Sequence, residues 1–191
     1  MNIHQLSVTY QAEPDRILVR VNTTAQQEMR MWLTRRLMAN LWPVLTKLLT
    51  EHLMALEAAA PSLTQADDGL KKMLADFRKE EFLRAADFDT PYQGGKAALP
   101  LGAKPLLVTE VDASPPFNGK VRLTFREKAP EGAKPRSFQM ELKPKLMQGL
   151  MHLLEQALAT SRWREPFSAP ALVPETAQSD PGETERPRYL N

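Results

Sequence analysis

The chain lacks cysteine, and this absence excludes a disulfide framework, a thiolate metal site and a cysteine nucleophile. It also has no stretch that approaches the roughly 20 consecutive apolar residues of a membrane-spanning helix. The first ten residues, MNIHQLSVTY, carry neither a basic leader nor an apolar run. We therefore expect a soluble, cytoplasmic protein with no membrane association.

Residues with catalytic or metal-binding chemistry are also scarce. The three histidines, His4, His52 and His152, have no spacing that matches a metal-binding motif. The tripeptide Gly94-Gly95-Lys96 lacks the preceding glycine and the following Ser or Thr of a phosphate-binding loop. We therefore predict a protein that is not an enzyme and that has no catalytic residues, metal or cofactor.

The strongest feature that is present is an internal repeat. The stretch Met29–Leu49 aligns without a gap with Phe138–Leu158. In each copy the apolar residues first alternate, as in a half-buried strand, and then recur with the spacing of one helix face. Thr34 is a good N-cap in the first copy, and Pro144 suits the first helical position in the second. The shared apolar positions are Met31 with Met140, Leu33 with Leu142, Leu37 with Leu146, Met38 with Met147, Leu41 with Leu150, Leu45 with Leu154 and Leu49 with Leu158.

Two further strands precede each copy of the repeat. We therefore predict an α+β fold of duplicated βββα modules, in which two three-stranded antiparallel meanders, each followed by a helix, form a pseudo-twofold domain. The spacing does not decide between one continuous sheet and two. The preceding strands are Ile3–Gln11 and Arg16–Thr23 around the turn Ala12–Asp15, and Leu106–Thr109 and Val121–Phe125 with Ser114–Gly119 as the first turn.

The rest of the chain separates by composition. Pro43 should kink or divide the first helix, because proline removes a backbone hydrogen bond there. The C-terminal segment is rich in Pro, Glu, Ser and Thr and cannot bury enough apolar surface to offset its chain entropy. The predicted units are 1–60 for the first βββα half, 61–88 for an extra mixed-charge helix that covers a sheet edge, 89–105 for a loop, 106–163 for the second half and 164–191 for a disordered tail.

Protein binding is the function that demands the fewest specific residues. Several methionines provide either core packing or an adaptable apolar surface. We therefore predict a non-enzymatic binding protein, a protein-assembly or regulatory adaptor with a protein partner. It would be a monomer or a homodimer, since an open strand edge can pair with a second copy. The partner-binding candidates are the apolar residues of the tail, Phe167, Leu172, Val173, Tyr189 and Leu190.

Single-stranded nucleic acid binding is the alternative. The chain has 25 basic and 23 acidic residues, and the basic excess lies on the two strand and helix halves. Side chains on the outward strand faces and at the helix starts would track phosphates, while an exposed tryptophan would stack on a base. The candidates are Arg20, Arg30, Trp32, Arg35, Arg36, Arg122, Arg126, Lys143 and Lys145.

This layout of repeated antiparallel strands, each set followed by a helix, resembles the Whirly and Pur-alpha group of single-stranded nucleic acid binders. The resemblance implies a pseudo-twofold core with strand faces available for a ligand. It is a likeness of arrangement, because no family motif matches residue by residue and three strands per half is one fewer than those families use.

Overall fold

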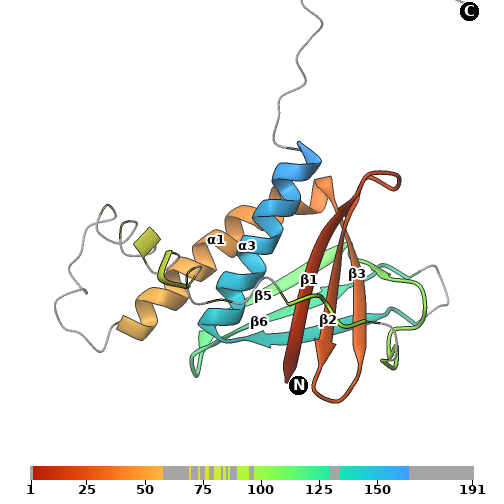
Figure 1. Cartoon of the computed structure of the whole chain (residues 1–191), viewed down its shortest axis with the longest axis horizontal. Helices are drawn as coiled ribbons and strands as arrows, with labels where there is room; N and C mark the ends of the chain where they lie inside the picture. The colour runs from red at the N-terminus through yellow and green to blue at the C-terminus, as the bar shows by residue number, and fades with distance from the viewer. Residues whose placement is uncertain are drawn as a thin grey trace, which may run out of the picture.

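The computed structural model describes residues 2–57, 69, 73, 76–77, 80–82, 84, 86, 90–94, 97–129 and 134–163. They form an α+β structure with two sheets and two long helices, and the described residues from 69 to 84 belong to a third helical segment (Figure 1). The elements are β1 Ile3–Gln11, β2 Arg16–Thr23, β3 Glu28–Thr34, α1 Arg35–Glu57, β4 Leu106–Leu107, β5 Glu110–Phe117, β6 Lys120–Arg126, β7 Ser137–Leu142 and α3 Pro144–Ser161.

The first meander has the strands that the sequence predicts. β1 and β2 pair antiparallel around the turn Ala12–Asp15, and β3 pairs antiparallel with β2. Asp15 adopts a φ of 48°, a left-handed conformation that Asp and Asn tolerate better than most residues. Alternate residues of β2 and β3, such as Val19 and Met31, are buried, which confirms the period-two pattern for these strands.

The predicted start of the second meander is wrong. Leu106 and Leu107 form β4, which pairs in parallel with β3, so the first sheet has the order β1-β2-β3-β4. Leu106 is fully buried and Val108 is 2% exposed, because both complete the core beside β3. The structure therefore has two sheets, and the second has the order β5-β6-β7.

The first turn of the second meander is also shorter than predicted. β5 continues to Phe117, and only Asn118 and Gly119 separate it from β6. Both turn residues have positive φ, 50° and 67°, as the two-residue turns that match strand twist require. Asn-Gly is a strong hairpin signal, so the expectation of a turn over Ser114–Gly119 overlooked a local rule.

The helices begin where the sequence predicts. The Thr34 hydroxyl accepts a hydrogen bond from the Leu37 amide at 3.3 Å, and Pro144 occupies the first turn of α3. Pro43 lies inside α1, which continues from Arg35 to Glu57, so of the two predicted outcomes, a kink or a split, the split does not occur. α3 ends at Ser161, and its C-cap residue Arg162 adopts the left-handed conformation common at helix C-termini.

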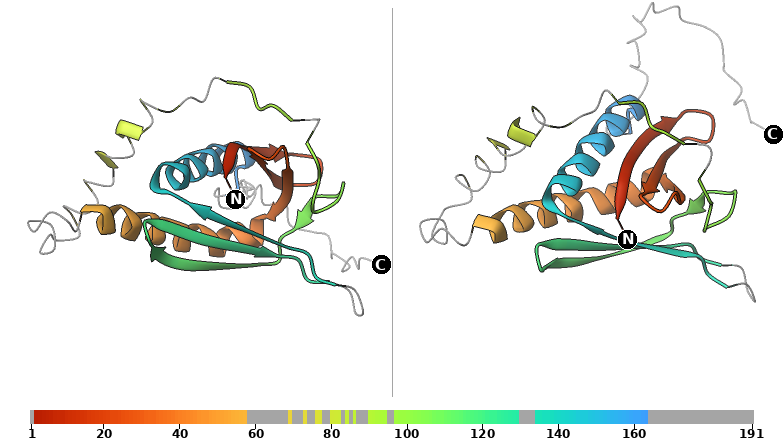
Figure 2. Two further views of the ribbon diagram at one scale, coloured as in Figure 1. Left: turned by 90° about the horizontal axis from the view of Figure 1, so that it is seen from below. Right: turned by 60° about the horizontal axis from the view of Figure 1, so that its bottom comes forward.

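Each helix packs mainly against the meander that it does not follow. α1 leaves β3 and lies against β5 of the second sheet, while α3 leaves β7 and lies against β1 of the first sheet (Figures 1 and 2). The inner faces of both sheets and the facing sides of both helices share one hydrophobic core. Met31, Met38, Met140 and Met147 are at most 1% exposed, so these methionines serve as core residues.

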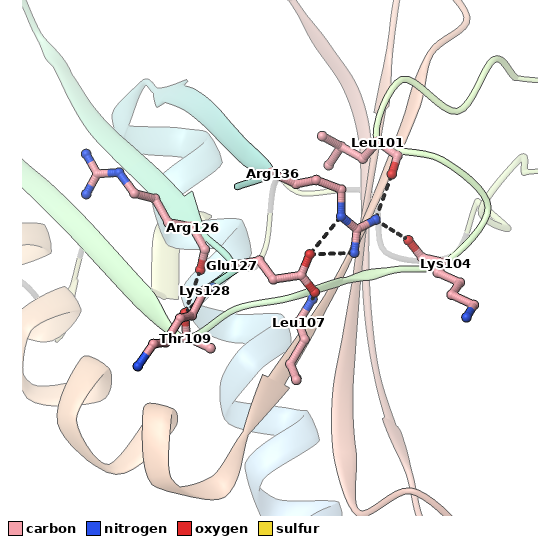
Figure 3. Close-up of polar contacts among 8 residues, drawn as sticks. All are labelled: Leu101, Lys104, Leu107, Thr109, Arg126, Glu127, Lys128 and Arg136. Atoms are coloured by element: carbon pink, nitrogen blue, oxygen red, sulfur yellow. Dashed lines mark hydrogen bonds and ion pairs between the residues drawn. The ribbon is translucent and has the colours of Figure 1, made fainter. Parts of the chain in front are cut away.

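Arg136, which precedes β7, ties the second sheet to the first (Figure 3). Its guanidinium donates to the Glu127 carboxylate from Nε at 2.7 Å and from Nη2 at 2.6 Å. Nη1 donates to the backbone carbonyls of Leu101 at 2.8 Å and Lys104 at 3.0 Å. The other Glu127 oxygen accepts from the amide of Leu107 in β4 at 3.1 Å. We call Arg136 and Glu127, with their contacts to Leu101, Lys104 and Leu107, the Arg136 node. The node connects the start of the β6–β7 loop to β4, the strand that completes the first sheet.

We expect Arg136→Gln to lower the free energy of unfolding by about 2 kcal/mol, because the charge-assisted hydrogen bonds to the partly buried Glu127 carboxylate and Leu101 carbonyl are lost. Arg126→Gln is the matched control, since Arg126 forms only exposed ion pairs with Glu110 and Asp112. Exposed pairs contribute at most about 1 kcal/mol. Urea unfolding measures both variants, and equal losses would contradict the special role of the node.

The end of α3 is fastened to the β1–β2 turn. The indole Nε1–H of Trp163 donates to Oδ1 of Asp15 at 2.7 Å, and the Tyr10 hydroxyl donates to the same oxygen at 2.8 Å. The Tyr10 and Trp163 rings meet edge to face, with centroids 5.7 Å apart. Hydrogen bonds from Trp163 and then Tyr10, with the nearby charge of Arg35, hold the pKa of Asp15 below its ordinary value. We call Tyr10, Asp15 and Trp163 the Trp163 latch.

The latch predicts a pH dependence of stability. A lowered pKa in the folded state means that the Asp15 carboxylate stabilises the fold above its unfolded pKa of about 3.9. This contribution is lost as the pH falls through the folded pKa. Asp15→Asn tolerates the positive φ and keeps an acceptor oxygen but has no charge. Thermal unfolding from pH 6 to pH 2 should show the difference between wild type and Asp15→Asn shrinking, and a constant difference would contradict the latch.

Candidate binding surfaces

A segment of the linker covers the outer face of the first sheet. Residues 90–94 and 97–98, which we call the strap, cross in front of β1, β2 and β3 in Figure 1. The Asn22 side chain donates to the Gln93 carbonyl at 2.9 Å, and the Gln93 amide donates to the Gln5 side chain at 3.0 Å. The Glu28 amide donates to the carbonyl of Ala98 at 2.8 Å. The strap therefore closes part of the face that the nucleic acid hypothesis requires to be open.

The two arginines predicted on this face are engaged within the chain. The Arg20 guanidinium lies over the Tyr92 ring, 4.4 Å from its centroid, and donates to the Ser7 hydroxyl at 3.0 Å. Arg30 forms a 2.5 Å ion pair with the buried carboxylate of Glu28. Burial, reinforced by the Glu28 charge and opposed by the two arginines, raises the pKa of Tyr92 to about 12, so its phenol stays neutral. Trp32 on β3 is partly buried.

We expect the combined substitutions Gln5→Ala and Asn22→Ala to loosen the strap without unfolding the sheets. Each removes a side-chain hydrogen bond to Gln93, worth about 1 kcal/mol. Hydrogen exchange measured by mass spectrometry should become faster in residues 90–98 and stay unchanged in β2 and β3. Gln11→Ala, which alters only an exposed contact with Thr9 on β1, is the control. Unchanged exchange in the strap would show that other contacts hold it.

The outer face of the second sheet is polar. Lys120, Arg122, Thr124 and Arg126 alternate along β6 with core residues. The Glu141 carboxylate on β7 accepts from Lys120 at 3.2 Å and from Arg122 at 3.1 Å. These two hydrogen bonds, Lys120 first, lower the pKa of Glu141, so the carboxylate remains ionised at neutral pH. At the other end of β6, Arg126 pairs with Glu110 and Asp112.

A groove of about 260 Å³ lies on this face at the β5–β6 turn. Phe117 stands at its rim with 74% of its surface exposed. α1 holds the turn in place, since Nε2 of the fully buried His52 lies 3.0 Å from the Gly119 carbonyl. The sequence prediction missed Phe117 and Lys120, although the Asn118-Gly119 pair would have placed both at a hairpin tip. The groove is lined by Ser114, Phe117, Asn118, Lys120, Arg122 and Glu141.

A larger groove, of about 430 Å³, lies between β1 and the first half of α3. Leu6, Leu146 and Leu153 give it apolar walls, and Phe82 of the third helical segment lies against it. Gly149 lines the wall formed by α3, and a Cβ there would make an ordinary van der Waals contact with the Phe82 ring at 3.5 Å. We call this the α3–β1 groove. His4, Gln5, Thr90, Tyr92 and Lys145 add a polar rim, and Ala86 completes the lining.

The structure separates the predicted basic residues at the helix starts. Arg35 is partly buried and lies near the Trp163 latch, while Arg36 is exposed. Lys143 and Lys145 are exposed at the start of α3. Because the latch marks the far end of α3, the two pairs lie at opposite ends of that helix. Of the nine candidates, only Arg122, Lys143 and Lys145 lie at the end of the second sheet that leads into α3.

The predicted partner-binding residues Phe167, Leu172, Val173, Tyr189 and Leu190 lie outside the described residues, as does most of the predicted helix 61–88. Within the described residues, no group of three or more His, Asp or Glu side chains could hold a metal ion. In the same part of the chain, neither long helix combines the length and the apolar character needed to cross a membrane. No family model, curated protein or solved structure matches this chain.

Proposed function

We propose that this chain is a non-enzymatic binding protein, a protein-assembly or regulatory adaptor that holds an extended segment of a partner protein in the α3–β1 groove. The observation that carries the proposal is the groove itself, about 430 Å³ with walls of Leu6, Leu146 and Leu153. This volume is within the range of protein sites that enclose a ligand, roughly 300 to 1,000 Å³. It accommodates one or two large apolar side chains of a partner.

The position of β1 supports an extended partner. β1 is an edge strand of the first sheet, and His4, Gln5 and Leu6 at its start line the groove. An extended peptide beside an edge strand gains main-chain hydrogen bonds, while its alternate side chains enter pockets next to the strand. The polar rim, which includes Lys145, would favour a partner segment with acidic residues flanking its apolar anchor.

We also propose that the two βββα units arose by duplication and are related by a pseudo-twofold axis. The alignment of Met29–Leu49 with Phe138–Leu158 supports this origin. The packing of each helix on the opposite meander agrees with such symmetry. β4, the strap and the third helical segment would then be later additions between the two units. Under this proposal the α3–β1 groove uses added segments for part of its wall.

The adaptor proposal predicts that Gly149→Met blocks partner binding. The new side chain would fill the groove, and replacing glycine inside a helix should raise helix stability by up to about 1 kcal/mol. A photoreactive amino acid at the exposed position of Lys145 should form a crosslink to a defined protein in cells. Gly149→Met should abolish that crosslink, as measured by gel shift and mass spectrometry.

Ala159→Met is the matched control, since Ala159 is an exposed residue of α3 beyond the groove and receives the same side chain. This variant should retain the crosslink. A photoreactive group at Thr160, which is exposed near the other end of α3, should not capture the same protein. Equal capture from both positions, or retention of the crosslink in Gly149→Met, would refute the groove as the binding site.

A further inference from the structure

Basic side chains gather where the second sheet leads into α3. Arg122 is opposite Glu141 in the sheet register, and Val121 is opposite Leu142, so Lys143 follows β7 at the end where β6 begins with Lys120. Lys143 and Lys145 are both exposed. Glu141 is the one carboxylate among the described residues that line the neighbouring groove, and it is shared between Lys120 and Arg122. This end of the sheet therefore has an excess of positive charge.

The start of α3 adds to this positive electrostatic potential. Its N-cap residue, Lys143, makes no side-chain capping hydrogen bond, and the first turn contains no acidic residue. The helix dipole favours an anion at this end, although Pro144 has no backbone N–H to donate and the Met147 amide already donates to the Lys143 carbonyl. An anion that reaches Lys143 from the groove therefore meets side-chain charges and the helix terminus together.

Phe117 supplies the second kind of contact. It is 74% exposed, although an aromatic ring of this size normally gains stability by burial. The ring borders the groove of about 260 Å³ that also contains Lys120 and Arg122. The tip that carries it is held by the hydrogen bond between His52 and the Gly119 carbonyl. Phe117 is therefore a ring on a fixed turn, beside cations and facing an open groove.

We propose that Phe117, Lys120, Arg122, Lys143 and Lys145, which we call the tip surface, bind single-stranded nucleic acid. A base stacks on Phe117 and enters the groove, and the adjoining phosphates contact the four basic side chains. Exposed aromatics next to cations on a sheet are how single strands are bound without sequence readout. A paired base in a duplex does not present its face to Phe117, so the surface selects single strands. The tip surface shares Lys145 with the rim of the α3–β1 groove, while Phe117, Lys120 and Arg122 line the separate groove at the β5–β6 turn.

Electrostatics at the two ends of β6 explain why the site lies at the tip. Arg126 at the far end is paired with both Glu110 and Asp112, so two carboxylates already oppose its charge. At the tip, Glu141 neutralises only part of the charge of Lys120 and Arg122. A bound phosphate replaces one of these exposed contacts, each of which contributes little to stability.

The test is a fluorescence anisotropy titration of the full chain with labelled oligothymidylate, oligouridylate, an abasic oligomer of the same length and a duplex, at two salt concentrations. Both single strands should bind, the duplex should bind more weakly, and added salt should weaken binding because condensed counterions are released. No binding of either single strand at low salt would overturn the proposal. Tighter binding of the duplex than of the single strands would also overturn it.

Two sets of variants locate the site. Phe117→Ala should weaken oligothymidylate binding about tenfold, should leave binding of the abasic oligomer unchanged, and should be restored by Phe117→Tyr. Lys120→Gln with Arg122→Gln should weaken all oligomers and reduce the dependence on salt. Arg36→Gln, an exposed residue at the start of α1, is the control and should have no effect. Equal losses from Arg36→Gln and the paired tip variant would overturn the site, as would insensitivity to Phe117→Ala.

Discussion

The exchange of helices between the two meanders is the constraint on which the rest of the structure depends. α1 lies against β5 and α3 lies against β1, so neither meander buries its apolar face with the helix that directly follows it. Both inner faces enter one core, and removing either helix would uncover the sheet of the other half. The Arg136 node and the Trp163 latch act at the edge of this arrangement, because the node joins the second sheet to β4 of the first and the latch joins the end of α3 to the β1–β2 turn. We therefore expect the described core to unfold as one cooperative unit.

The shared core leaves each sheet with one outer face, and the two outer faces differ in what covers them. The linker between α1 and β4 returns across the first sheet, where it forms the strap and engages Arg20 and Asn22. The second sheet has no such segment over it within the described residues, and its outer face carries exposed ion pairs and the groove beside Phe117. The same linker and the third helical segment form part of the α3–β1 groove. The linker and the third helical segment thus influence which surfaces stay accessible.

The sequence predicts the elements with a clear period and misses what depends on long-range pairing. Alternation in β2, β3, β6 and β7 identifies the core side chains, and Thr34 and Pro144 identify the helix starts. The short apolar run at Leu106 suits either sheet, and only its contact with β3 assigns it to the first. The packing of each helix on the opposite meander has no local signature in the sequence. The apolar face of α1 could pack equally well on β3 or on β5. For the same reason Arg20 and Arg122 look alike in sequence, although only Arg20 lies beneath a strap.

The two hairpin tips hold the helices by different groups and leave different side chains exposed. Each tip holds the helix of the opposite half: the β1–β2 turn holds the end of α3 through Asp15 and Trp163, and the β5–β6 turn holds α1 through Gly119 and His52. At the first tip the aromatic side chains Tyr10 and Trp163 pack on each other, so the fastening uses the rings. At the second tip the fastening uses a backbone carbonyl and a buried imidazole, and the ring of Phe117 remains exposed. The connection between the β5–β6 turn and α1 therefore leaves the Phe117 ring exposed beside Lys120 and Arg122.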